Sequence, residues 1–125
     1  MEIRTGIDII EVNRIKDAIE SLGTPFLNRV FTSDEISYCE SKNNMKFQHY
    51  SARFAGKEAV FKAISKEVKN KYDITWKDIE IKNDEQGRPY FTVNKIDASN
   101  IVSKDISLSH IKDYAMASVS IIIND

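Results

Sequence analysis

The spacing of the apolar residues changes twice along this chain of 125 residues, and these changes constrain its fold class. Apolar residues alternate over residues 2–9, which is typical of a strand with one apolar face. They recur at helical spacing over residues 12–22 and again over residues 47–68. Four strand-like segments follow. This order predicts an α+β fold in which a mostly antiparallel sheet packs against a long helix, within one domain of residues 1–125.

Local signals divide the chain further. Gly23 predicts the end of the first helix, and residues 24–30 are typical of a short helical turn. The motif "TSDE" at residues 32–35 is a capping box that predicts the start of another helix. Residues 85–87 predict a hairpin between two strands. The C-terminal segment "SVSIII" is apolar on both faces, so we expect it at the centre of the sheet or at a subunit contact.

The composition describes a globular protein, with 42% hydrophobic and 30% charged residues. A net charge of −1 argues against a generally basic nucleic-acid-binding protein. No apolar run approaches the roughly 20 residues that a membrane span needs, and the N-terminus lacks the pattern of a signal peptide. Cys39 is the only cysteine, which excludes an intrachain disulfide and favours a reducing, cytoplasmic setting.

Asp8 lies among isoleucines in "GIDIIEVNRI", residues 6–15. An ionised carboxylate is costly to bury unless something compensates its charge. The alternation places Asp8 on the less apolar face of the strand, together with Arg4 and Gly6. Its partner must therefore come from another part of the chain.

The longest predicted helix carries charged residues at unusual positions. Lys57 falls in the middle of the apolar arc of residues 54–68, so its ammonium must extend to the surface or meet an anion. Arg53, one turn earlier, could bind the same anion through its planar guanidinium. Glu58 and Lys62, four residues apart, are consistent with an ordinary helix ion pair as well as with a shared binding site.

Other features leave alternatives open. Residues 42–71 hold eight lysines or arginines and two glutamates, which fits either a polyanionic ligand or a solvated helix face. Gly56 is either tolerated within the helix or needed for close packing. His110, at a strand end, is either structural or part of a site. No HExxH, GxSxG or P-loop motif is present, which argues against the enzyme classes that those motifs mark.

Three motifs together resemble a known family. "GIDIIEVNRI" near the N-terminus, "RFAGKEAVFKAI" in the middle and "SLSH…YAMASV" near the C-terminus are similar to the holo-[acyl-carrier-protein] synthases, the small bacterial type of 4'-phosphopantetheinyl transferase. The resemblance covers nearly the whole chain in the right order. It implies transfer of 4'-phosphopantetheine from coenzyme A to a serine of apo-acyl carrier protein, giving holo-acyl carrier protein and adenosine 3',5'-bisphosphate in support of fatty acid biosynthesis.

The resemblance also implies roles for individual residues. Asp8 and Glu58 match the carboxylates that hold Mg²⁺, and this ion is typically bound by one or two carboxylates, substrate phosphates and waters. Lys62 matches a catalytic lysine on the coenzyme A phosphates. The serine proton would go to Glu58 or to a metal-held water. Further residues that match positions lining the nucleotide pocket are Arg53, Lys57 and His110.

The family implies partners as well. Its members form homotrimers with active sites between subunits, and an acidic carrier protein docks beside the first helix. The residues expected at this docking surface are Arg14, Lys16, Phe26 and Arg29. Two departures from the family pattern concern the periphery: the usual Gly-x-Gly after the long helix is missing from "SKEVKNKYDITW", and residues 1–32 carry four basic against five acidic groups.

Two other functions fit parts of the pattern. The basic stretch alone would suit a non-catalytic module that binds a nucleotide or coenzyme A. A structural trimer whose charged helix is only a solvated face is the third alternative. The three motifs in register favour the transferase.

Overall fold

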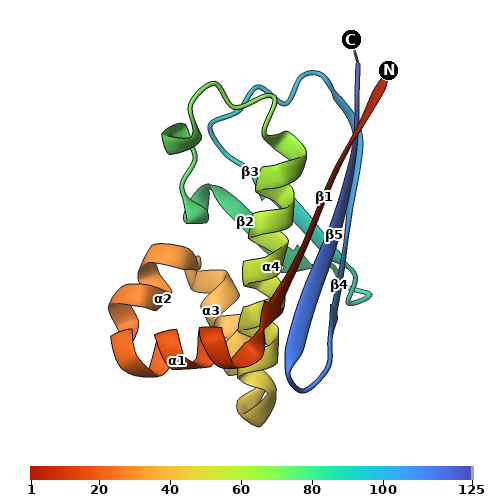
Figure 1. The fold of residues 1–125 in the computed structure, drawn as a ribbon. Helices are drawn as coiled ribbons and strands as arrows, with labels where there is room; N and C mark the ends of the chain where they lie inside the picture. Colours follow the sequence, from red (N-terminus) through yellow and green to blue (C-terminus); the bar gives the residue numbers. More distant parts are fainter. Residues whose placement is uncertain (125) are drawn as a thin grey trace.

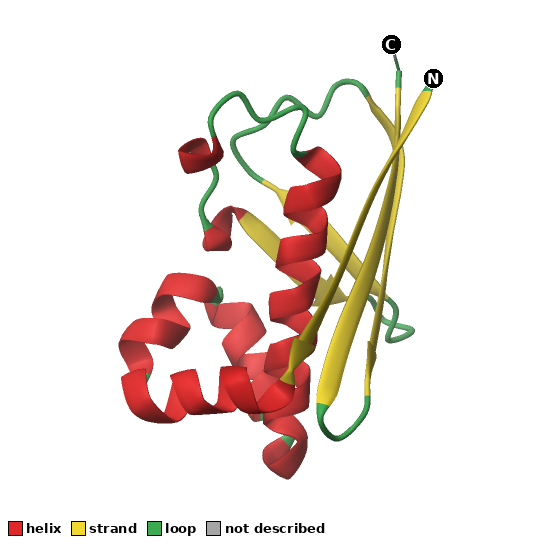
Figure 2. Ribbon diagram, in the orientation of Figure 1, coloured by secondary structure: helices red, strands yellow, loops and turns green. Residues whose placement is uncertain are grey.

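A computed structural model describes residues 1–124 of the chain, with the side chain of Lys71 outside the described part. Five strands, four α-helices and three short 3₁₀ turns follow one another in the described chain (Figures 1 and 2). Their bounds, in chain order, are β1 (Glu2–Glu11), α1 (Val12–Leu22), α2 (Thr24–Val30), α3 (Ser33–Glu40), η1 (Asn43–Met45), α4 (Lys46–Ile64), η2 (Lys71–Asp73), η3 (Trp76–Asp78), β2 (Ile79–Asn83), β3 (Pro89–Val93), β4 (Ile101–His110) and β5 (Tyr114–Ile123).

All strand pairs are antiparallel, as predicted, but they form two sheets. β1, β5 and β4 form a three-stranded sheet in that order, whereas β2 and β3 form a separate hairpin. The central place of β5 confirms the expectation from its two apolar faces. Figure 1 shows α4 between the long sheet and the group of α1, α2 and α3, so that this helix is covered on most sides.

The local helix signals are confirmed. Gly23 ends α1 with a φ of 65° and donates its backbone N–H to the carbonyl of Ile19. Positive φ is tolerated best by glycine, which explains the residue type at this position. Thr32 and Glu35 form the predicted capping box at the start of α3.

Gly56 lies at a close packing contact. A Cβ at this position would lie 2.3 Å from the Cδ1 of Ile81 and 3.3 Å from the Cδ2 of Leu108. The missing side chain therefore lets α4 approach both sheets closely. Of the two alternatives left open by the sequence, the structure selects close packing, although the contact is with side chains rather than with another backbone.

The faces of β1 differ from the simplest expectation for a strand. Its apolar face is exposed, with Ile3, Ile7 and Ile9 at 71%, 60% and 63% relative exposure. The face that contains Gly6 and Asp8 packs against α4 instead. This orientation brings a carboxylate from the strand to the long helix.

Candidate active site

Asp8 and Lys62 meet where β1 crosses α4. The Lys62 ammonium lies 3.3 Å from Oδ1 of Asp8 and donates a 2.8 Å hydrogen bond to the carbonyl of Ile7. Lys62 is half exposed, so its ammonium remains accessible to a ligand. The ordinary helix pair that the sequence allowed is not formed, because no ion pair joins Glu58 to Lys62 within residues 1–124.

Glu58 completes a cluster with Asp8 and Lys62. Burial raises the pKa of the Glu58 carboxyl above its ordinary value, and the negative charge of Asp8 raises it further, while Lys62 opposes this shift. In the part of the chain that the structure describes, no hydrogen bond or ion pair reaches the Glu58 carboxylate. The cluster is therefore a region of concentrated negative charge with a single neighbouring ammonium.

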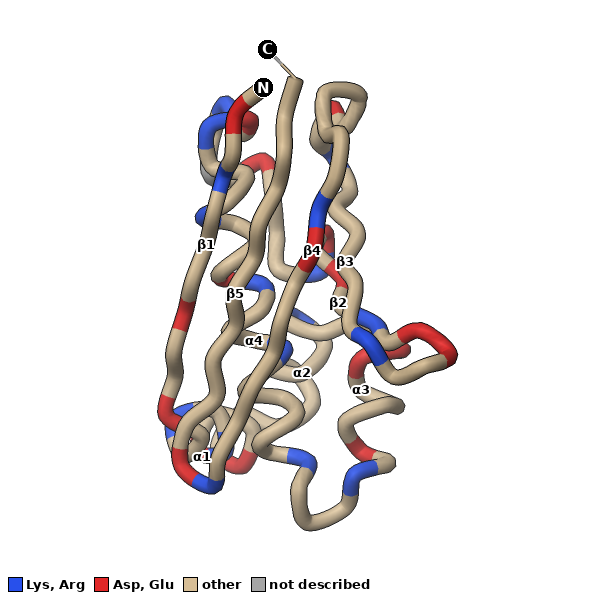
Figure 3. Tube along the Cα trace, turned by 90° about the vertical axis from the view of Figure 1, so that its right-hand side faces the viewer, with Lys and Arg blue, Asp and Glu red and all other residues tan. Residues whose placement is uncertain are grey.

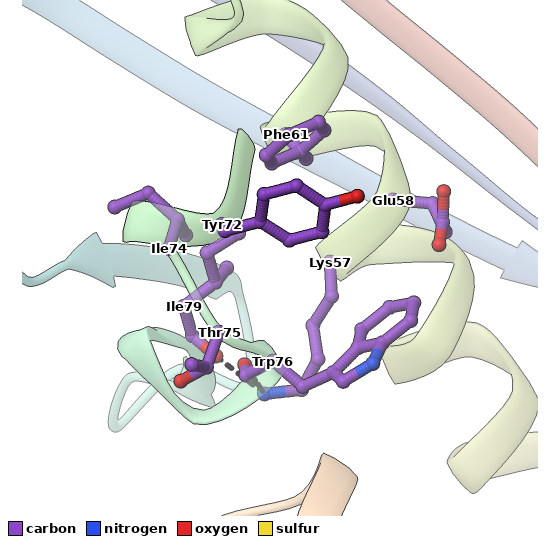
Figure 4. Close-up of a pocket in the computed structure, with 8 residues that line it drawn as sticks. All are labelled: Lys57, Glu58, Phe61, Tyr72, Ile74, Thr75, Trp76 and Ile79. Atoms are coloured by element: carbon purple, nitrogen blue, oxygen red, sulfur yellow. Dashed lines mark hydrogen bonds between the residues drawn. The ribbon is translucent and has the colours of Figure 1, made fainter. Parts of the chain in front are cut away.

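Two cavities share Glu58 as a lining residue. The first, of about 400 Å³, lies between β1, α1 and α4, and contains Asp8, Arg14 and Phe26 in its walls. The second, of about 240 Å³, lies between α4 and residues 72–79, and its walls are mostly apolar. Figure 4 shows this second cavity, where the Glu58 carboxylate points away from the Lys57 ammonium. Phe54 lines the first cavity and Trp76 lines the second. Their rings stack with centres 4.8 Å apart, so the two cavities adjoin at this stack.

Lys57, for which the resemblance implies a place in the nucleotide pocket, is held by groups of its own chain. Its side chain is fully buried, and its ammonium forms a 2.8 Å ion pair with Glu35. Burial lowers the pKa of Lys57, while the Glu35 charge opposes that shift. Of the two alternatives that the sequence left open, extension to the surface or pairing with an anion, the structure shows the second, and the anion is a carboxylate of the same chain.

Arg53 and His110 belong to a second group of residues. The Arg53 guanidinium lies 4.0 Å from the centre of the Tyr38 ring and donates a 2.5 Å hydrogen bond to Oδ1 of Asn83. His49 lies between Tyr38 and His110, with ring centres 5.7 Å and 5.1 Å away. We call Tyr38, His49, Arg53 and His110, together with Lys42 over the Tyr38 ring, the Tyr38 cluster.

The Tyr38 cluster and the Asp8–Glu58–Lys62 cluster lie on different sides of α4. Arg53 and Glu58 are five residues apart, which is roughly 140° around a helix. Arg53 lies roughly 180° from Lys62 around α4, and it bonds to Asn83 whereas Lys57 pairs with Glu35, so Arg53 shares no anion with either lysine in the described chain. The eight cationic residues counted between 42 and 71 likewise do not form one surface patch, because Lys57 is buried and Arg53 is almost fully buried.

The expected docking residues are only partly exposed. Arg14 and Arg29 are exposed, and Lys16 is half-buried with its ammonium 5.6 Å from the centre of the Phe47 ring. Phe26 is buried and packs edge-on against Phe31. It nevertheless lines the first cavity beside Arg14.

Several residues that shape these sites carried no clear signal. Gly6 lets α4 approach β1 closely, and Glu35 pairs with the Lys57 ammonium. The Tyr38 ring packs against Arg53, and the His49 ring packs against His110. Glu35 was predicted only as half of a capping box. The one signal for a distant acid was the position of Lys57 in the middle of an apolar helix face, where its own helix offers no acidic partner.

The Asp8–Glu58 pair fits Mg²⁺ better than an ion that needs an all-protein cage. Within residues 1–124, no group of three or more histidine, cysteine, aspartate or glutamate side chains could hold a metal. Mg²⁺ usually takes one or two carboxylates and completes its shell with waters and substrate phosphates. Asp8 and Glu58, the latter without a hydrogen-bond donor in the described chain, could supply the protein ligands of such an ion.

Comparisons with known proteins agree with this geometry. The chain matches the 4'-phosphopantetheinyl transferase superfamily over residues 4–119. The holo-[acyl-carrier-protein] synthase of Ruminiclostridium cellulolyticum is 42% identical over 130 positions, covering 100% of this chain and 96% of that protein. This chain belongs to the holo-[acyl-carrier-protein] synthase family.

Solved structures of the family share the fold. The holo-[acyl-carrier-protein] synthase of Helicobacter pylori, in complex with coenzyme A, superposes with a TM-score of 0.80 at 31% identity, over 94% of this chain and 99% of that one. The enzyme from Bacillus anthracis, in complex with CoA (3',5'-ADP), gives a TM-score of 0.77 at 30% identity, over 94% of each chain. No helix among the described residues of this family member is long and apolar enough to cross a membrane.

Proposed function

We propose that this member of the holo-[acyl-carrier-protein] synthase family transfers 4'-phosphopantetheine from coenzyme A to a serine of apo-acyl carrier protein. The observation that carries the proposal is the Asp8–Glu58–Lys62 cluster, placed beside two cavities in a chain of this family. The serine oxygen forms a bond to the β-phosphorus of coenzyme A. The bond from that phosphorus to the bridging oxygen breaks, and adenosine 3',5'-bisphosphate leaves with the electron pair.

Lys62 is the residue that we assign to the pyrophosphate. Its half-exposed ammonium can exchange the weak 3.3 Å contact with Asp8 for a phosphate oxygen. A fixed positive charge beside oxygens on which negative charge accumulates lowers the barrier to phosphoryl transfer. We assign Lys62 as catalytic for this reason.

Asp8 and Glu58 would hold Mg²⁺ beside the same phosphates. When bound, this ion supplies Lewis-acid neutralisation of phosphate oxygens. A cation also removes the repulsion between the two carboxylates, which is one of the causes of the raised pKa of Glu58. The protein's contribution is to keep both carboxylates on the facing surfaces of β1 and α4.

Glu58 is our candidate for accepting the serine proton, directly or through one water. Burial, the largest cause of its raised pKa, makes it a better base than an exposed glutamate. Glu58 also lines the cavity beside Arg14 and Phe26. A serine that enters this cavity would approach Glu58 from the α1 side.

The carrier protein is proposed to dock over α1 and α2. The exposed Arg14 lines the first cavity, and the exposed Arg29 of α2 and the half-buried Lys16 of α1 add positive charge to these two helices. Phe26 contributes an apolar wall rather than a protruding contact. Because acidic residues share this surface, we expect apolar contacts to supply part of the affinity.

We also propose a homotrimer whose active sites lie between subunits. The long sheet exposes Ile3, Ile7 and Ile9 on one face, next to β5, which carries no charged residue (Figure 3). Large exposed apolar faces are typical of subunit contacts. The Tyr38 cluster and the Asp8–Glu58–Lys62 cluster would meet across this contact, so that Arg53 and His110 of one subunit bind coenzyme A held by its neighbour.

A mass measurement tests the proposed reaction. The protein, coenzyme A and Mg²⁺ should increase the mass of a bacterial apo-acyl carrier protein by one phosphopantetheine group. Asp8→Asn and Glu58→Gln should abolish the increase. If neither substitution changed turnover, the assignment of the carboxylate pair would be wrong. Coenzyme A binding without transfer by the folded protein would favour the non-catalytic binding module instead.

A further inference from the structure

A buried ion pair links α3 to α4 next to the proposed catalytic carboxylate. Lys57 directly precedes Glu58 in α4, and its ammonium lies 2.8 Å from Oε1 of Glu35. Both side chains have no exposed surface. A buried ion pair is rarely a source of stability relative to apolar residues, so its presence calls for another explanation.

The pair is fully satisfied by groups of the same chain. The Lys57 ammonium donates to the carbonyls of Trp76, at 3.0 Å, and of Ile79, in addition to Glu35. These three acceptors match its three N–H groups. No donor of Lys57 is left for a phosphate, which separates this residue from Lys62.

Glu35 extends the connections to two further segments. Its Oε2 accepts a 2.8 Å hydrogen bond from the backbone N–H of Ile81, and its Oε1 accepts one of 2.9 Å from that of Thr32. The pair thus fixes three backbone positions within residues 76–81 relative to α4. The same residues 76–81 provide one wall of the second cavity.

Residues 76–81, which the Glu35–Lys57 pair holds, form part of the cavity that Glu58 lines. The side chains of Trp76 and Ile79 line the same cavity as Glu58 (Figure 4). Trp76 stacks on Phe54, one helical turn before Glu58, at 4.8 Å and an interplanar angle of 27°. Any movement of residues 76–81 away from α4 would change this stack and open the cavity.

We propose that Glu35 and Lys57 are positioning residues for the transfer reaction, because they clamp residues 76–81 to α4 and so hold the cavity around Glu58 in its reactive shape. This inference rests on the proposed function. Neither residue touches the substrate. Their removal should therefore reduce kcat while leaving the affinity for coenzyme A largely intact.

The test uses a double substitution. Each single variant leaves an unpaired charge in the interior and is expected to be strongly destabilised, whereas replacing both partners removes the charges together. Glu35→Gln with Lys57→Met is the variant to compare with the wild type. The matched control is Asp34→Asn with Lys82→Met, which removes an exposed ion pair between α3 and β2, at the residues next to Glu35 and Ile81.

Three measurements are made on each folded protein: kcat for carrier modification, the dissociation constant for coenzyme A, and acrylamide quenching of tryptophan fluorescence. Trp76 is the only tryptophan, so its quenching reports on the wall itself. We expect kcat to fall about 10- to 100-fold, as for small misplacements of reacting groups. Quenching should increase, and the dissociation constant should change far less than kcat. The control should behave like the wild type.

Any other set of results for kcat, quenching and coenzyme A affinity would overturn the inference. Unchanged kcat or unchanged quenching would mean that the pair does not position the wall. A loss of coenzyme A affinity as large as the loss in kcat would make Lys57 a ligand-binding residue, as the sequence suggested. A double variant that cannot fold would show a purely structural role. Failure of the wild type to modify any carrier would instead count against the proposed function, so the two failures can be told apart.

Discussion

Gly6 in β1 lies against the backbone of Ala59 in α4, with no side chain between them. A Cβ at Gly6 would be 1.8 Å from the carbonyl oxygen of Ala59 and 2.8 Å from its carbonyl carbon. Two residues after Gly6 is Asp8, and one residue before Ala59 is Glu58. The closeness of the two carboxylates thus depends on a position where only hydrogen fits.

Gly6→Ala should therefore damage both stability and the carboxylate pair. The added methyl group meets backbone atoms, which cannot rotate away, so we expect a loss of about 2 kcal/mol or more in the free energy of unfolding. Urea denaturation measures this loss, and carrier modification should fall with it. Thr5→Ala, on the exposed face of the same strand, should cost about 0.5 kcal/mol or less. Equal effects of the two substitutions would contradict the close contact.

Glu58→Gln should separate stability from activity. The folded protein raises the pKa of Glu58, so the ionised carboxylate is less stable there than in the unfolded chain at neutral pH. Removing the charge should abolish carrier modification and, without Mg²⁺, raise the melting temperature at pH 7. The gain should disappear as the pH falls and the wild-type carboxyl becomes protonated. The exposed Glu20→Gln is the control and should show no such gain.

His49 should make stability depend on pH between about 4 and 6.5. Burial, followed by His110 and the nearby cations, lowers its pKa from 6.5 to about 4. The folded state thus keeps His49 neutral while the unfolded chain takes up a proton, so stability is lost as the pH falls through this range. Urea unfolding of His49→Gln should show a correspondingly weaker slope, and identical slopes would argue against the shift.

Ile7→Lys should dissociate the proposed trimer. A charge in the middle of the exposed apolar face of β1 is costly to bury in a subunit contact. Light scattering should give the mass of three chains for the wild type and of one for the variant, and coenzyme A binding should weaken if two subunits form each site. Leu22→Lys, at an exposed position of α1, is the control. A fully active wild-type monomer would refute the trimer.

Arg14→Glu should weaken carrier docking without affecting coenzyme A. Reversing an exposed charge beside the first cavity should raise the KM for an acidic carrier about tenfold or more, equivalent to about 1.4 kcal/mol. The KM for coenzyme A should stay unchanged. Arg88→Glu, at another exposed arginine, in the β2–β3 hairpin, serves as the matched charge reversal. Similar KM values for the two variants would move the docking surface elsewhere.

Element types and most boundaries could be predicted from the sequence, because their causes are local. A glycine with positive φ ends α1, and a threonine that caps its own helix begins α3. The central position of β5 was one of the two places that its apolar faces predicted, although one of those faces remains exposed in the single chain. The three motifs further identified the family, because motif order survives even where single residues change.

The candidate site was predicted less completely. Asp8, Glu58 and Lys62 lie together, as expected, but Lys57 turns to Glu35 and Arg53 turns to Tyr38. Helical spacing describes neighbours along one helix and gives no information about a carboxylate 22 residues earlier. The sequence could therefore show that Lys57 had to extend to the surface or meet an anion, but not which of the two, nor which anion.

By itself, then, the sequence determined the elements, their order and the presence in the first strand of a carboxylate whose partner had to come from elsewhere in the chain. Only the tertiary structure decided that the polar face of β1 packs on α4 and that its isoleucines remain exposed. The physical reason is that alternation distinguishes the two faces of a strand without saying what covers either one. The contact at Gly6 fixes that choice, because a backbone can approach α4 so closely only where the strand has no side chain.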